Sequence, residues 1–173
     1  MHVRTISRWS KILLLAAFAF YFAVIVFNNL TDFGSNYDFV RHTLSMDTTF
    51  PGNRGMWHAV TSPHVYLAFY LALITWEALN ATLCLLGAIK LFRARHMPDA
   101  EFQHAKIIGI AALTSAMLQW LVAFEIIGGE WFLMWQSHQW NGQEAGFRMF
   151  MMQAVIMLLL QMPEPNSAHN IEQ

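Results

Sequence analysis

The sequence predicts an all-α, polytopic membrane protein: a four-transmembrane-helix bundle with a long first outer loop. Hydrophobic residues make up 56% of the 173-residue chain, whereas charged residues make up only 12%. A water-soluble domain carries roughly 25% charged residues, so this chain has about half of the charge that a wetted surface needs. The apolar residues also gather in four stretches that are long enough for helices. We therefore expect a single integral membrane domain over residues 1–173.

Composition and motifs exclude several classes of function. The net charge of −1 offers no basic face, so nucleic acid is not expected as a partner. The high apolar content excludes intrinsic disorder. The only cysteine, Cys84, can form neither an internal disulfide nor a cysteine-based metal site. Hydrolytic, phosphate-loop and dinucleotide motifs are absent, so we expect no enzyme activity, no catalytic residues, no metal and no cofactor.

The first apolar stretch is expected to be a retained helix over about residues 10–30. Residues 12–27 contain no charge and no amide, and basic residues precede them. A secretory signal peptide has a similar pattern, but its apolar core is followed by a small-x-small cleavage site. Phe27 is followed instead by Asn28, Asn29 and Leu30. The stretch therefore predicts a first membrane span.

Three further spans are expected along the chain. Pro63 suits the first turn of the second helix. The pair Gly128-Gly129 should loosen or end the third helix, and Pro163 and Pro165 should stop the fourth. The expected spans are residues 64–91, 105–127 and 145–162, with outer loops at 31–63 and 128–144.

Lysine and arginine in the short loops predict the orientation. Seven of the ten basic residues fall on one side of the expected membrane: Arg4, Arg8, Lys11, Lys90, Arg93, Arg95 and Lys106. Cytoplasmic loops carry this excess, so both termini should be cytoplasmic. Trp9 should then mark the inner interface, and Trp57, Trp131, Trp135 and Trp140 the outer one, as aromatic belts do.

One carboxylate, Glu77, lies near the middle of the second expected span. A charge there costs roughly 2.5–3.5 kcal/mol, so Glu77 should face the bundle and find a partner. Asn80 and Cys84 continue a polar and small stripe suited to close helix packing. Glu125 and Arg148 lie at similar depth and are expected to pair. The expected intramembrane polar residues are Glu77, Asn80, Gln119, Glu125, Arg148 and Gln153.

The two outer loops hold most of the unusual residues. In the first, Asn36 could cap a short helix that carries Val40 and Leu44 on one face, and residues 50–53 predict a turn. The second contains Trp131 and Trp135, which would share one helical face at this spacing, and an Asn141-Gly142 turn. We expect an outer docking face formed by Arg54, Trp57, Glu130, Trp131, Trp135, Trp140 and Asn141.

Three functions follow from these features. The favoured one is a non-enzymatic accessory or scaffold protein whose outer face docks a partner or lipid; its partners would be membrane lipid and a membrane protein or a second copy of the chain. The runner-up is a small proton-coupled carrier or ion pathway that uses Glu77, with Glu125 as an outer relay. The third is a redox subunit that binds quinone, or haem at the outer rim between His64 and His138.

A resemblance supports the membrane assignment. The strings GGEWFLMWQSHQWNGQEAGFRM, DTTFPGNRGMW and ITWE resemble a bacterial family of predicted small integral membrane proteins, a domain of unknown function. The resemblance covers roughly residues 10–162. It implies a bacterial inner-membrane location and about four helices, and it implies no activity and no catalytic residues.

Overall fold

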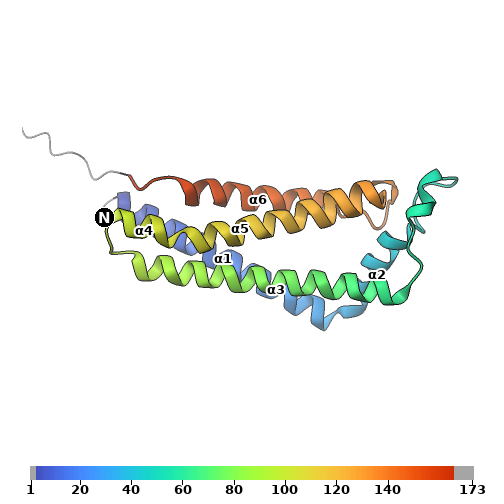
Figure 1. The fold of residues 1–173 in the computed structure, drawn as a ribbon, viewed down its shortest axis with the longest axis horizontal. Coiled ribbons are helices and arrows are strands. Elements are labelled where there is room, and N and C mark those ends of the chain that lie inside the picture. Colours follow the sequence, from blue (N-terminus) through green and yellow to red (C-terminus); the bar gives the residue numbers. More distant parts are fainter. Residues whose placement is uncertain (1–2, 166–173) are drawn as a thin grey trace, which may run out of the picture.

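A computed structural model describes residues 3–165 of the chain, and its regular elements are all helical. Figure 1 shows that the long helices run side by side along the long axis. They are α1 (Val3–Thr31), α3 (Pro63–Ala94), the succession α4 (Asp99–Ala105), α5 (Ile107–Gln119) and η2 (Trp120–Trp131), and α6 (Gln143–Gln161). Helix α2 (Phe33–Ser45) and the single turns η1 (Arg54–His58) and η3 (Met134–Gln136) lie in the two connections.

The packing order follows the chain. Helix α1 packs on α3, α3 on α5, α5 on α6, and α6 returns to α1. The bundle has two distinct ends, which we call the cap end, where α2, η1 and η3 lie, and the basal end, where α1 begins, α4 lies and α6 finishes (Figure 1). Both described ends of the chain therefore lie at the basal end.

Two glycines bring α3 and α5 into close contact. A Cβ added at Gly87 would lie 2.9 Å from the backbone Cα and N of Gly109. A Cβ at Gly109 would lie 2.7 Å from Leu15 Cδ2, and Leu15 itself is fully buried. Small residues allow such backbone approach between helices in membranes. The close crossing of α3 and α5 thus depends on the absence of a side chain at Gly87, while Leu15 of α1 occupies the space that a side chain at Gly109 would need.

Three helical stretches are long and apolar enough to cross a membrane: Val3–Thr31, Pro63–Ala94 and Asp99–Trp131. They match the first three expected spans, although each extends several residues farther. Helix α6 matches the fourth in position, but among the described residues it does not reach the same combination of length and hydropathy. Its amides and its charged first half lower its hydropathy. The described residues therefore contain three helices that could each cross a membrane.

The third span does not end at Gly128-Gly129, so that half of the expectation was wrong, but the helix is loosened there, which is the other outcome that the sequence allowed. Residues 120–131 form a π-helix, a wide helix with i→i+5 hydrogen bonds, and it continues through both glycines. Phe132 N donates to the Ile127 carbonyl across this wider spacing. Gly129 leaves room for Gln143, since a Cβ at Gly129 would lie 2.6 Å from the Gln143 Nε2 atom.

The helical expectation for the second outer loop was also wrong. The π-helix stops at Trp131, and Leu133 adopts a left-handed backbone with φ of 52°. The reversal separates Trp131 from Trp135, so the two indoles do not share one helical face. In the first loop Asn36 does not cap α2 either, because α2 follows α1 almost directly and begins at Phe33, after Asp32.

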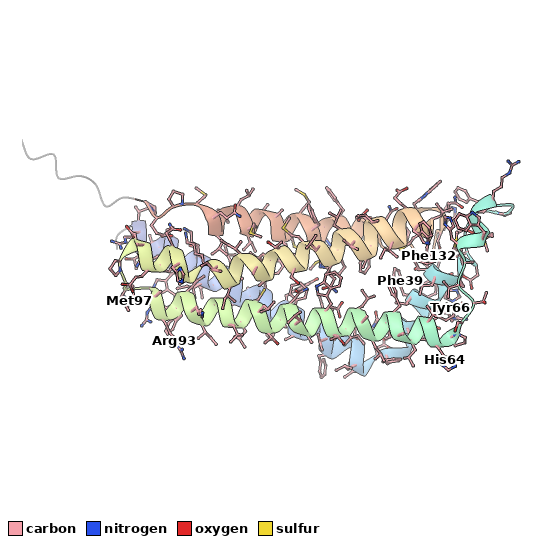
Figure 2. The ribbon with its side chains drawn as sticks, in the orientation of Figure 1. Phe39, His64, Tyr66, Arg93, Met97 and Phe132 are labelled. Atoms are coloured by element: carbon pink, nitrogen blue, oxygen red, sulfur yellow. The ribbon has the colours of Figure 1, made fainter. Side chains whose placement is uncertain are left out.

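The cap has its own small core. Val40 and Leu44 are buried on one face of α2, as predicted, and pack with Tyr66, Tyr70 and Phe132. Figure 2 shows Phe39, Tyr66 and Phe132 converging at this end of the bundle. The predicted turn at residues 50–53 is present, with the Asn53 amide donating to the Phe50 carbonyl at 3.2 Å. The cap is thus packed on the first turns of α3 through this small core.

Candidate functional site

The cap end exposes a group of large apolar side chains. Five of them are between 44% and 74% exposed and form what we call the cap aromatic surface: Phe50, Met56, Trp57, Trp131 and Trp135. They come from two connections far apart in the sequence. The rings of Trp57 and Trp131 lie 6.0 Å apart, and those of Phe50 and Trp135 lie 5.7 Å apart, both edge to face.

Polar contacts hold the two connections together beneath this surface. The His58 ring stacks on Trp131 at 4.4 Å, and its Nδ1 lies 2.6 Å from the Trp131 carbonyl oxygen. Gln136 Oε1 accepts hydrogen bonds from the Phe50 backbone N–H and from Asn53 Nδ2, both at 3.2 Å. The aromatic side chains are therefore presented by cross-linked backbone rather than by two independent loops.

The seven predicted docking residues differ in how exposed they are. Six of them are exposed at the cap end: Arg54, Trp57, Glu130, Trp131, Trp135 and Asn141. The seventh, Trp140, is half-buried and stacks on His42 with ring centroids 4.7 Å apart. Trp140 therefore supports the cap from below. The linking residues His58 and Gln136 were not identified from the sequence, since nothing local distinguishes them from other polar loop residues.

Glu77 faces the bundle, as predicted. It is 5% exposed, and its Oε2 accepts a hydrogen bond from Asn29 Nδ2 of α1 at 2.6 Å. Tyr70 donates its hydroxyl to the Asn29 carbonyl oxygen at 2.9 Å, which holds Asn29 in place. The carboxyl group therefore ties α3 to the end of α1. Asn29 was not identified from the sequence, because it stands at the margin of the first apolar stretch.

A second polar network joins α3 to α5. Asn80 Nδ2 donates to Gln119 Oε1 at 2.7 Å, and Ser115 Oγ donates to Asn80 Oδ1 at 2.8 Å. Trp76 Nε1 completes the chain by donating to Ser115 Oγ at 2.9 Å. Since Glu77 faces α1 while Asn80 faces α5, the expected single polar stripe is divided between two helix interfaces.

The remaining predicted polar residues are not joined to these networks. Gln153 is fully buried, and within residues 3–165 neither its amide nor Gln119 Nε2 has a hydrogen-bond partner. The expected Glu125–Arg148 ion pair is not formed. Arg148 is exposed on α6, whereas Glu125 Oε1 is buried against Gly146, at 2.9 Å from the place of its absent Cβ.

The basal end contains a buried ion cluster that we call the basal clamp: Lys11, Lys106 and Glu164. Glu164 Oε1 lies 2.5 Å from Lys11 Nζ and 3.1 Å from Lys106 Nζ, and all three side chains are at most 5% exposed. Both ammonium groups also donate to the Met162 carbonyl oxygen, at 2.7 and 2.8 Å. The clamp therefore joins α1, the α4–α5 junction and the segment after α6.

The electrostatics of the clamp favour an ionised Glu164. Burial raises the pKa of its carboxyl group, but hydrogen bonds and charge attraction from Lys11 and Lys106 outweigh burial and hold the pKa below its usual value. Sequence reasoning used both lysines only as loop charges for orientation and did not identify Glu164. A partner that lies more than fifty residues away along the chain leaves no local signal.

Metal-binding arrangements are not seen among the described residues, which hold no group of three His, Cys, Asp or Glu side chains placed to share an ion. His64 and His138, the two candidates for a rim haem, are both exposed. In Figure 2 His64 stands at the start of α3, on the cap end of the bundle.

Comparison with known proteins gives one match. The model of a family described as predicted small integral membrane protein (DUF2165) matches residues 7–163, which is nearly the whole chain. No curated protein matches it. The solved structures contain no match either.

Proposed function

We propose that this chain, which belongs to the DUF2165 family of predicted small integral membrane proteins, is a non-enzymatic accessory or scaffold protein. Its cap aromatic surface docks the extramembrane part of a partner membrane protein. The observation that carries this proposal is the exposure of three tryptophans, Trp57 at 74%, Trp131 at 51% and Trp135 at 46%, on one cross-linked support.

The composition of this surface supports a protein partner. Tryptophan, tyrosine and arginine dominate the residues that carry binding energy at protein interfaces, and exposed apolar patches of this kind mark interaction sites. Arg54 and Glu130 add exposed charges at the rim, where they would orient a partner. The contacts between His58 and Trp131 reduce the entropy that would otherwise be lost on binding.

The length of α3 supports a position of the cap aromatic surface outside the lipid. Its 32 residues span about 48 Å at 1.5 Å per residue, whereas the hydrocarbon core is about 30 Å thick. The helix therefore extends beyond the hydrocarbon by roughly 18 Å, shared between its ends. Trp57 precedes the first residue of α3 and stands in the turn η1 at the cap end. An indole that only anchors the protein would stand at the headgroup level.

The topology is part of this proposal. We place α6 in the membrane as a fourth span, because it runs beside α5 and its 19 residues cover about 28 Å. With four spans, both termini lie on one side, and the bias of basic residues makes that side the cytoplasm. The compartment we propose is the bacterial inner membrane, with the cap end facing outward.

The proposal predicts a stoichiometric partner. Protein extracted in native lipid discs at its natural expression level and weighed by mass spectrometry should carry a second protein. The variant Trp57→Ala/Trp131→Ala/Trp135→Ala should reduce co-purification of this protein at least tenfold, because truncating a central interface aromatic commonly costs 2 kcal/mol or more.

A matched control removes three aromatics from the lipid-facing sides of the helices. Phe20→Ala/Phe27→Ala/Phe147→Ala replaces residues that are 60–72% exposed and should leave co-purification unchanged. The proposal fails if the wild-type particle contains no second protein, or if both triple variants retain the partner equally well.

The second candidate is the proton-coupled carrier or ion pathway. The observation that favours it is the carboxyl group of Glu77 at the middle of α3, enclosed by the bundle and bonded to a single amide. Intramembrane carboxyl groups commonly belong to proton or ion pathways. We favour the structural role, because Asn29 is itself held by Tyr70 and the arrangement joins two helices.

Glutamine at Glu77 separates the two roles. Glu77→Gln keeps the size of the side chain and can still bond Asn29, so we expect normal expression and a thermal midpoint within about 3 °C of the wild type, whereas Glu77→Leu should lower it further. Proton or ion flux in proteoliposomes is the second readout. Flux in the wild type that is lost in a normally folded Glu77→Gln variant would establish the carrier instead.

A further inference from the structure

A cavity of about 650 Å³ opens at the basal end, on the side where α3 faces α4 and the start of α5. This volume lies within the roughly 300–1,000 Å³ of small-molecule sites. Its lining divides into a polar part, Lys90, Arg93, Glu101 and His104, and an apolar part that includes Ile107 and Ile108. In Figure 2 Arg93 and Met97, another lining residue, stand together at this end. The cavity is thus amphipathic.

Within residues 3–165, the cations of this cavity are not neutralised by a carboxylate. At the same end of the bundle Arg4 and Arg8 pair with Asp99, and the two lysines of the basal clamp pair with Glu164. Lys90 and Arg93 have no carboxylate within salt-bridge distance anywhere in residues 3–165. Glu101 is the one acid among the lining residues, so the cavity carries a net positive charge.

The depth of the cavity matches the membrane interface. Arg93 stands in the last turn of α3, and Lys90 stands one turn earlier. Ile107 and Ile108 open the apolar run of α5, so the apolar side of the cavity continues toward the hydrocarbon. This arrangement puts cations at the headgroup level and aliphatic side chains directly below them. A molecule that is anionic at one end and aliphatic at the other would match both parts.

We propose that this cavity binds an anionic phospholipid, with the headgroup phosphate between Lys90, Arg93 and His104 and an acyl chain along Ile107 and Ile108. Arginine and lysine are the usual partners of phosphate oxygens, and basic pockets between membrane helices recognise anionic headgroups. The site is separate from the cap aromatic surface, at the opposite end of the bundle. It does not depend on the function proposed for that surface.

The proposal predicts selectivity for charge in the lipid. Purified full-length protein in neutral detergent, titrated with phosphatidylglycerol or phosphatidylcholine and read by native mass spectrometry, should bind phosphatidylglycerol more tightly. Lys90→Gln/Arg93→Gln should weaken that binding by about tenfold to thirtyfold and leave phosphatidylcholine binding unchanged, since each cation near a lipid surface contributes about fivefold.

Two further variants make the test specific. Arg41→Gln/Arg148→Gln removes the same charge from the cap end, at exposed or half-exposed positions, and should bind both lipids as the wild type does. Glu101→Gln removes the one acid of the cavity and should tighten phosphatidylglycerol binding by a few-fold. The opposite signs expected for Lys90→Gln/Arg93→Gln and Glu101→Gln separate a local charge effect from general damage.

The site is disproved if the wild type binds both lipids equally, or if Lys90→Gln/Arg93→Gln binds phosphatidylglycerol as tightly as the cap-end control. If Lys90→Gln/Arg93→Gln does not fold, the Glu101→Gln variant and the salt dependence of phosphatidylglycerol binding test the site instead. Phosphatidylglycerol binding that Glu101→Gln does not tighten, and that is equally strong in 50 and 500 mM NaCl, would also overturn the proposal.

Discussion

Replacing Glu164 with glutamine should destabilise the protein by about 3–5 kcal/mol, because removing one partner of a buried ion pair leaves uncompensated charge. Here two ammonium groups, those of Lys11 and Lys106, would remain buried with the Met162 carbonyl oxygen as their shared acceptor. The free energy of unfolding can be measured by titrating the protein in mixed micelles with sodium dodecyl sulfate. Helical circular dichroism would report the fraction folded.

An exposed ion pair provides the control. Asp38→Asn breaks the bridge between Asp38 and Arg41, whose side chains are 49% and 42% exposed, and should cost at most about 1 kcal/mol. Replacing all three residues of the basal clamp with methionine should recover most of the loss, since no buried charge would remain. A cost for Glu164→Gln no larger than that of Asp38→Asn would show that the clamp does not stabilise the fold.

The clamp should also be visible in the pH dependence of stability. The pKa of Glu164 is lowered in the folded protein, from an unfolded value of about 4.3. Its contribution is therefore fully present above the unfolded pKa and is lost as the pH falls through the folded pKa. The difference in stability between the wild type and Glu164→Gln should stay constant between about pH 5 and pH 7 and shrink below about pH 4.

Leucine at Gly87 should have an effect of similar size. The backbone of Gly109 lies 2.9 Å from the place of a Cβ at Gly87, so any side chain there must push α3 and α5 apart. Overpacking in a core costs about 1–3 kcal/mol and occasionally more, and we expect Gly87→Leu to reach about 3 kcal/mol because the obstacle is backbone. The same detergent titration measures it.

Gly34 offers a matched control on another helix. No atom lies within 4 Å of the place of its Cβ, and it is exposed on α2. Gly34→Leu should stabilise the protein slightly, by up to about 0.8 kcal/mol, because leucine favours a helix more than glycine does. Equal stability of the two leucine variants would contradict the close crossing of α3 and α5.

Much of the fold could be predicted from the sequence, because hydropathy and helix stops are local properties. The apolar stretches give the positions of α1, α3 and the succession α4–α5–η2, and Pro163 marks the end of α6 near Gln161. The extra helical length beyond each stretch could not be predicted this way, since it is polar. It is stabilised by contacts between helices, such as those from Arg8 to the Arg95 and Met97 carbonyl oxygens.

In the candidate sites, too, local properties could be predicted from the sequence and the contacts between distant residues could not. The cost of a carboxylate in the membrane predicted that Glu77 would be buried with a partner, but not that the partner would be Asn29. Tryptophan content indicated the cap, but the backbone reversal at Leu133 was needed to separate Trp131 from Trp135. The basal clamp joins residues that are distant in sequence, so only the packed bundle brings its charges together. The lining of the basal cavity comes from one short stretch, residues 90–108, but the cavity itself forms only where α3, α4 and α5 pack.

Because of the π-helix over Trp120–Trp131, the protein should tolerate apolar substitutions in this segment but not the insertion or deletion of a residue. Loss of a single residue there would let the segment rewind as an α-helix, and membrane insertion would barely change. Each residue turns an α-helix by about 100°, however, so Trp131 would swing away from His58 and the cap would lose its alignment. Through evolution, apolar substitutions in this stretch should therefore be far more common than insertions or deletions.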